Sequence, residues 1–156
     1  MSEIILKEGL PAPDFTLMGS DQKQHRLSDY LGKRIILYFY PRDNTPGCSK
    51  EAEAFRDHFH TFANANTVIL GISRDSLASH DKFIAKYNLP FVLLSDSDEE
   101  VCKLYDVLKE KNMYGRISLG IERSTFIIDE QGIITKIYRK VKVAGHVESC
   151  QLELGL

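Results

Sequence analysis

The sequence predicts an α/β fold in which a central mixed β-sheet is flanked by helices. Runs of β-branched and aromatic residues alternate with amphipathic segments, which is typical of parallel strands joined by helices. Near the C-terminus two such runs are separated only by a short glycine-containing turn, which indicates an antiparallel hairpin. The chain has 156 residues, 43% of them hydrophobic, so residues 1–156 are expected to form a single domain with one hydrophobic core.

The first elements are short. Phe15 and Leu17 alternate with polar residues, residues 19–21 (Gly-Ser-Asp) form a turn signal, and residues 28–31 precede Gly32. This order predicts a strand, a turn and a short helical piece. We therefore expect a β extension at the N-terminal side of the main fold.

Residues 34–40, Arg-Ile-Ile-Leu-Tyr-Phe-Tyr, form a continuous run of β-branched and aromatic side chains. Such a run is expected for a strand that is buried on both faces of a sheet, and Pro41 marks its end. From Pro46 to about Phe62, apolar residues recur at intervals of three and four, which predicts one amphipathic helix: Ala52, Phe55, Phe59 and Phe62.

Two further strands are predicted at residues 67–73 and 91–95. The helix between them carries the apolar residues Leu77, Phe83, Ile84 and Tyr87. Because strands and helices alternate here, these strands are expected to pair in parallel.

The C-terminal part predicts a helix over residues 98–105 and a hairpin of residues 125–128 and 133–138. A last helix over residues 146–154 would place Val147, Cys150 and Leu154 on one side, against the sheet. The predicted order is therefore N-terminal additions, a βαβ unit, a helix, a hairpin and a closing helix. This is the order of a thioredoxin-like fold.

The charge of the chain excludes several classes of partner. Its 20 basic and 22 acidic residues give a net charge of −2 and are spread along the chain, so neither nucleic acid nor an anionic membrane is expected to bind. The first residues do not resemble a signal peptide, and no later segment is long and apolar enough for a membrane span. Three cysteines do not make a disulfide framework, so we expect a cytoplasmic protein in a reducing compartment.

Residues 41–48, Pro-Arg-Asp-Asn-Thr-Pro-Gly-Cys, form the junction between a strand and a helix. Thr45 is a natural N-cap, Pro46 suits the first helical position, and Cys48 falls in the first turn. Unpaired backbone N–H groups and the positive end of the helix dipole favour the thiolate of Cys48. A cysteine at a helix start is more often a small buried hydrophobic residue, so the neighbouring residues must decide.

The segment PRDNTPGCSKEA contains the pattern Pro-x-x-x-Thr-x-x-Cys and resembles the active-site signature of the peroxiredoxins. It is most similar to the branch called peroxiredoxin Q or bacterioferritin comigratory protein, and the likeness continues in PAPDFTL, GISRDS, SHDKF, LPFVLLSD, MYGR, GIERSTFIID and GHV. The resemblance implies a thioredoxin-like fold with extra N-terminal elements and a peroxidase that reduces hydrogen peroxide and small organic hydroperoxides.

The same resemblance implies a role for four residues. Cys48 would be the peroxidatic cysteine, whose thiolate attacks peroxide and becomes a sulfenic acid. Thr45 would hydrogen-bond the peroxide or the sulfur, and Arg123 would stabilise the thiolate and the developing negative charge. Pro41 would shield the sulfenate from water. Dithiol exchange, a competing activity of this fold, is disfavoured because Thr45 stands where the first of two cysteines would be.

The sequence departs from this branch at the resolving cysteine, which would form a disulfide with the oxidised residue. Many members carry it five positions after the first, where this chain has Glu53, and others carry it in the next helix, where residues 76–88 contain none. Either Cys102 or Cys150 could resolve Cys48 after local unfolding, within one chain or across two chains. Both could instead simply pack as buried residues. The working hypothesis is a one-cysteine cycle.

In that cycle thioredoxin, glutaredoxin or a small thiol such as glutathione reduces Cys48 again. An alternative function is a redox sensor of the same fold that passes the oxidation state of Cys48 to a partner. The branch is often monomeric, so a monomer is expected.

No metal or organic cofactor is expected. His58 and His60 point to different faces of one helix, and the acidic run of residues 96–100 lacks the ligand spacing of a calcium loop.

Overall fold

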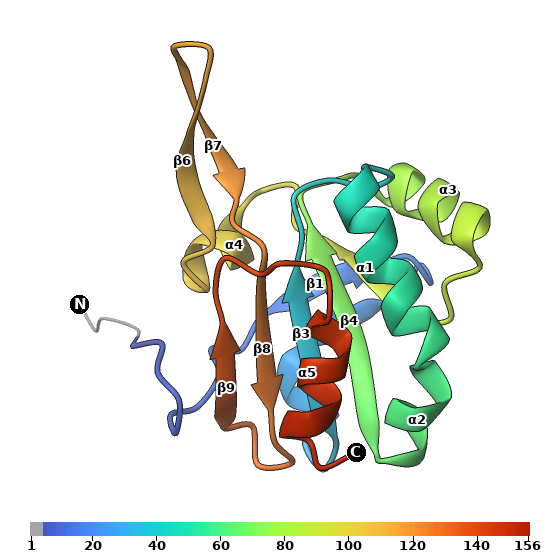
Figure 1. Cartoon of the computed structure of the whole chain (residues 1–156). Helices are drawn as coiled ribbons and strands as arrows, with labels where there is room; N and C mark the ends of the chain where they lie inside the picture. The colour runs from blue at the N-terminus through green and yellow to red at the C-terminus, as the bar shows by residue number, and fades with distance from the viewer. Residues whose placement is uncertain (1–4) are drawn as a thin grey trace.

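The computed structural model describes residues 5–156 and contains a seven-stranded mixed sheet with the strand order β2-β1-β5-β4-β3-β8-β9 (Figure 1). The strands are β1 (Thr16–Gly19), β2 (Gln24–Arg26), β3 (Arg34–Phe39), β4 (Thr67–Ser73), β5 (Val92–Ser95), β8 (Ser124–Ile128) and β9 (Ile134–Tyr138). The predicted mixed sheet is therefore confirmed.

Strand directions also agree with the sequence pattern. β3, β4 and β5 are parallel, and β8 and β9 form an antiparallel hairpin that joins the sheet beside β3. The N-terminal β extension pairs antiparallel to β5 through β1. This arrangement places the carboxyl end of β3 beside the beginning of β8, because Phe39 pairs with Ser124.

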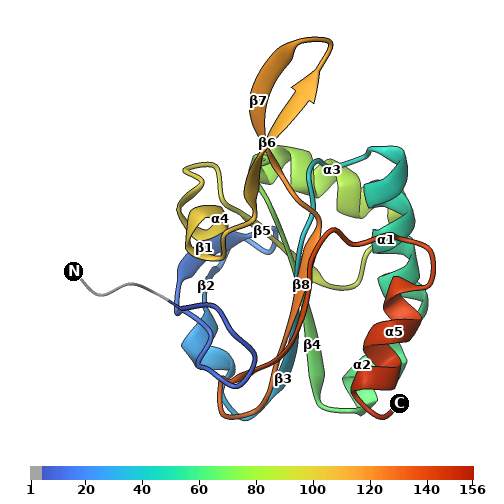
Figure 2. The same cartoon turned by 60° about the vertical axis from the view of Figure 1, so that its left-hand side comes forward.

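Helices cover both faces of the sheet (Figure 2). One face packs against α1 (Pro46–Asp57), α2 (Phe59–Asn64), α3 (Leu77–Tyr87) and α5 (His146–Glu153), and the other packs against α4 (Glu100–Leu104) and a 3-10 helix, η1 (Leu27–Tyr30). No helix within residues 5–156 has the length and apolar character that crossing a membrane requires.

The alternation of side chains along β3 divides the core into two layers. Ile35, Leu37 and Phe39 contribute to the layer on the α4 side, whereas Ile36 and Tyr38 contribute to the layer under α1 and α5. The strand is thus buried on both faces, as its continuous apolar run predicts.

The single helix predicted from Pro46 to about Phe62 is wrong, because the structure breaks it at His58. The Nδ1 atom of His58 lies 2.9 Å from the carbonyl oxygen of Ala54, the group that the His58 N–H would reach in a continuous helix. That N–H instead donates to the carbonyl of Arg56. The imidazole therefore competes with the backbone for one carbonyl, and a separate helix, α2, begins at Phe59.

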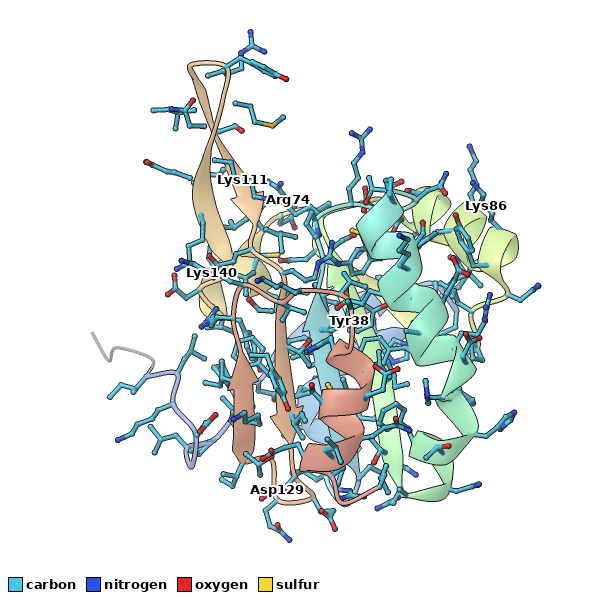
Figure 3. All side chains as sticks on the ribbon, in the orientation of Figure 1. Tyr38, Arg74, Lys86, Lys111, Asp129 and Lys140 are labelled. Carbon is cyan, nitrogen blue, oxygen red and sulfur yellow. The ribbon has the colours of Figure 1, made fainter. Side chains whose placement is uncertain are left out.

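The sequence pattern missed a second hairpin, formed by β6 (Leu108–Met113) and β7 (Arg116–Ile121). It extends away from the body of the protein (Figure 1), and its outer residues, such as Lys111 (Figure 3), are exposed. Tyr114 and Gly115 both have positive φ, as a two-residue hairpin turn requires. Few of its side chains are buried, so it leaves little hydrophobic alternation in the sequence.

Candidate active site

The loop after β3 delivers a cysteine to the beginning of α1. Pro41 lies just past the end of the strand, Thr45 is the N-cap with extended backbone angles, and Pro46 begins the helix. The hydroxyl of Thr45 makes no capping bond and donates to the carbonyl of Arg42 at 2.9 Å. The N–H groups of the first turn are therefore not satisfied by this side chain.

Cys48 is 2% exposed and contacts a cation from a distant part of the chain. Nη2 of Arg123 donates a hydrogen bond to Sγ of Cys48 at 3.3 Å. Arg123 immediately precedes β8, and the pairing of Phe39 with Ser124 brings this end of β8 beside the end of β3. The sheet register thus brings together two of the residues that the resemblance named, 75 positions apart in the chain.

A third residue, Glu51, completes this contact and was not predicted. Nη1 of Arg123 donates to Oε1 of Glu51 at 2.6 Å, and the carboxylate side chain is fully buried. Glu51 lies three residues after Cys48, so one turn of α1 places both side chains on the face toward Arg123. The sequence signal that could have indicated a functional role for Glu51 is an acidic residue on the otherwise apolar face of this helix.

Burial and charge act against each other in this ion pair. Burial raises the pKa of Glu51 to about 7, although the nearby Arg123 guanidinium acts to lower it. Burial alone would lower the pKa of Arg123, but the negative charges of Glu51 and Cys48 outweigh it and raise that pKa. Arg123 therefore stays positively charged, and it can stabilise negative charge on the sulfur.

Gly47 allows the guanidinium to approach the helix start. A Cβ atom built at this position would lie 3.2 Å from Nη2 of Arg123, closer than ordinary van der Waals contact. The absence of a side chain at Gly47 thus leaves room for the bond between Arg123 and Cys48.

Two buried polar atoms beside this ion pair have no hydrogen-bond partner among the described residues: the hydroxyl of Tyr38 and Oε2 of Glu51. Tyr38 lies between the sheet and the helices α1 and α5 (Figure 3), and burial, followed by the charge of Glu51, raises its pKa well above the ordinary value. Tyr38 is therefore a neutral phenol behind the ion pair.

The other two cysteines are fully buried and distant in sequence from the first. Burial raises the pKa of Cys150 to about 12, and burial together with Asp96 raises that of Cys102 further. Sγ of Cys150 lies 3.7 Å from Nε2 of His146, whose pKa is lowered to about 4, chiefly by burial. Both thiols are thus protonated in the folded protein, and a protonated thiol is a poor nucleophile.

Comparisons with known proteins agree with this geometry. The profile of the AhpC/TSA family matches residues 9–137. A putative peroxiredoxin bcp of Coxiella burnetii is 51% identical over 142 residues, which are 91% of this chain and 94% of that protein. Peroxiredoxin Bcp of Bacillus subtilis is 50% identical over 139 residues, 89% of this chain and 88% of that protein.

Solved structures give the same result. One is a structure of the Xanthomonas campestris bacterioferritin comigratory protein, which is described with respect to its alkyl peroxide reduction activity. It has a TM-score of 0.89 at 44% identity, and the match covers 96% of this chain and 98% of that chain. A yeast mitochondrial 1-Cys peroxiredoxin, described as resolved through glutathione and thioredoxin systems, has a TM-score of 0.76 at 26% identity, over 95% of this chain and 78% of its own.

Proposed function

Because this chain belongs to the AhpC/TSA family, in its peroxiredoxin Q or BCP branch, and is a thiol peroxidase, we propose that Cys48 is the residue that peroxide oxidises. The single observation that carries this assignment is the Arg123 guanidinium, which contacts both Sγ of Cys48 and the buried carboxyl of Glu51. A cation fixed beside the sulfur stabilises the thiolate and the negative charge that moves onto the leaving oxygen.

The first half of the cycle consumes the peroxide. The Cys48 thiolate attacks the terminal oxygen of ROOH, an S–O bond forms, and the O–O bond breaks with its electron pair leaving on RO⁻. The alkoxide, or hydroxide when the substrate is hydrogen peroxide, takes a proton and departs as ROH or water. Sulfur is oxidised by two electrons to the sulfenic acid, and the peroxide is reduced by two electrons.

The position of Thr45 supports a role in binding the substrate. Its hydroxyl lies at the helix start and, when it turns from the carbonyl of Arg42, can hydrogen-bond the incoming peroxide. Pro41, on the same loop, is half-buried and would limit the access of water to the sulfenic acid. We propose hydrogen peroxide and small organic hydroperoxides as substrates.

For the second half of the cycle we propose resolution by an external thiol. R′SH attacks the sulfenic acid to give a mixed disulfide and water, and a second thiol releases the Cys48 thiol and R′SSR′. The support is the Glu53 side chain at the usual position of a resolving cysteine, together with the burial and raised pKa of Cys102 and Cys150.

Thioredoxin, glutaredoxin and glutathione are the proposed reductants. The similar yeast 1-Cys peroxiredoxin, described as using glutathione and thioredoxin systems, supports this choice. A monomeric, cytoplasmic protein stays a prediction.

The proposal is tested by stopped-flow reaction of the reduced protein with hydrogen peroxide, followed by mass spectrometry of the product. We expect rapid loss of one thiol, a mass gain of one oxygen at Cys48, and no rapid reaction in Cys48→Ser. A rate near that of a free thiol would contradict the peroxidatic role of Cys48.

The one-cysteine cycle is tested with the double variant Cys102→Ser/Cys150→Ser in NADPH-coupled turnover with thioredoxin, glutaredoxin or glutathione. Turnover equal to that of the unchanged chain is expected. If the double variant reacts once with peroxide but does not turn over, one of these two cysteines is the resolving residue and the one-cysteine cycle is wrong.

A further inference from the structure

The loop that carries Thr45 is held against α3 by a buried cluster centred on Asp43. Oδ1 of Asp43 accepts a hydrogen bond from the hydroxyl of Tyr40 at 2.6 Å. Oδ2 accepts from the hydroxyl of Ser79 at 2.8 Å and lies 2.8 Å from Nδ1 of His80. Asp43 is 7% exposed and His80 is completely buried, so water competes little for these bonds.

Both ring nitrogens of His80 have a hydrogen-bond partner. Nδ1 faces the Asp43 carboxylate, and Nε2 lies 3.0 Å from the carbonyl oxygen of Leu94. Each ring nitrogen therefore has one partner, the Asp43 carboxyl on one side and the backbone of β5 on the other. The Asp43 and His80 side chains therefore form a buried hydrogen-bonded pair.

Further bonds fix the same loop. The backbone N–H of Asp43 donates to Oδ2 of Asp75, which also accepts from the hydroxyl of Ser73. Oδ1 of Asn44 accepts from Nζ of Lys86 at 3.0 Å, on the exposed side of α3 (Figure 3). Unlike the exposed contact of Asn44 with Lys86, the bond between Asp43 and His80 joins two buried side chains.

Asp43 stands midway between Pro41 and Thr45, two residues from each. Its carboxyl group cannot turn away from α3 without leaving Nδ1 of His80 buried and without this partner, which is costly. We propose that His80 is a positioning residue for the peroxidase reaction: through Asp43 it sets the loop of residues 41–45, and so the places of Pro41 and Thr45 around the incoming peroxide. This inference rests on the proposed role of Cys48.

The groups that act on the sulfur are attached elsewhere. Arg123 reaches Cys48 from the start of β8 and is held by Glu51 on α1, and neither of them bonds to Asp43 or His80 in the structure. Loss of the His80 contact should therefore disturb the place of the peroxide more than the thiolate itself. Because the groups that contact the sulfur are separate from those that hold the loop, a positioning role can be measured apart from any effect on the thiolate.

The test compares two reactions of Cys48 in His80→Gln. Oxidation by hydrogen peroxide depends on an aligned substrate, and misplacement of a positioning group by about 1 Å can cost up to a hundredfold in rate. Alkylation by iodoacetamide depends on the thiolate alone. We expect the peroxide rate constant to fall by at least about tenfold, while the alkylation rate constant changes by less than about twofold.

A matched control is His58→Gln, because His58 also bonds through Nδ1 but lies at the far end of α1 from the loop. It should leave both rates unchanged. In the double variant Asp43→Asn/His80→Gln, the two amides can donate to and accept from each other, so part of the peroxide rate should return. If His80→Gln does not fold, Tyr40→Phe, which removes one donor to Asp43 and keeps the ring, is expected to show the same selective loss.

The positioning role is overturned if His80→Gln lowers the rate constants of peroxide oxidation and alkylation equally, or lowers neither. If the unchanged chain oxidises rapidly at Cys48 and His80→Gln is equally fast, this inference alone is wrong. If the unchanged chain itself reacts slowly, the proposed role of Cys48 fails, and the positioning role fails with it.

Discussion

Glu51→Gln is expected to change how the stability of the protein depends on pH. The carboxyl is fully buried, and its pKa is raised from an ordinary 4.5 to about 7, by burial that exceeds the attraction of Arg123. The folded protein therefore holds this proton more tightly than the unfolded chain does. Its contribution to stability is complete below pH 4.5 and is lost progressively as the pH rises from 4.5 to about 7.

The magnitude follows from the size of the shift. One unit of pKa corresponds to about 1.4 kcal/mol, so the full effect of the Glu51 carboxyl is about 3 kcal/mol, most of which falls between pH 5 and pH 8. Glutamine is nearly the same shape as the protonated carboxyl, can still accept from Arg123, and does not ionise. The free energy of unfolding of wild type should thus decrease relative to that of Glu51→Gln by roughly 2 to 3 kcal/mol between pH 5 and pH 8.

The assay is urea unfolding of both proteins, with the thiols kept reduced, at one-unit steps from pH 5 to pH 8. Glu53→Gln is the matched control, because Glu53 is on the same helix but its side chain is 38% exposed beside Arg56. The free energy of unfolding of Glu53→Gln should change with pH in parallel with that of wild type. If the difference between wild type and Glu51→Gln stays constant from pH 5 to pH 8, the attraction of Arg123 matches or exceeds the cost of burial, and the reasoning is refuted.

Two further substitutions test the geometry around Arg123. Arg123→Lys keeps the charge, but one ammonium group cannot reproduce the planar guanidinium that bonds to both Glu51 and Cys48. The rate constant with hydrogen peroxide, measured by stopped flow, should therefore fall by about tenfold to a hundredfold. A change of less than twofold would contradict a bridging role for Arg123. Gly47→Ala places a Cβ 3.2 Å from Nη2 of Arg123, so the same rate constant should fall severalfold. Chemical denaturation should find no loss of stability, because alanine is the better helix former. An unchanged rate constant would mean that the guanidinium moves aside freely.

The sequence by itself determined the order of the main strands and helices. Residues 34–40 are apolar without interruption, which is the pattern of a strand buried on both faces, and residues 125–138 contain a hairpin signal with glycine in the turn. The start of the helix at Pro46 was equally readable, because Thr45 and Pro46 act through local backbone geometry. Such features depend on residues that are near one another in the chain.

The pairing of Cys48 with Arg123 was accessible only through the resemblance to a family. Nothing local connects two residues 75 positions apart, and the register of β3 with β8 decides the contact. The hairpin of β6 and β7 escaped prediction for a related reason: its side chains are mostly exposed, and hydrophobic periodicity reports only faces that are buried.

Tertiary structure alone decided which polar side chains are buried. Five histidines look alike in the sequence, yet packing of α3 against the loop after β3 buries His80 beside Asp43, whereas His58 ends a helix. Glu51 and Glu53 are two residues apart on α1, and only Glu51 faces Arg123. The cost of burying a polar group without a hydrogen bond makes a partner necessary at each buried position, and that partner comes from an element far away in the chain.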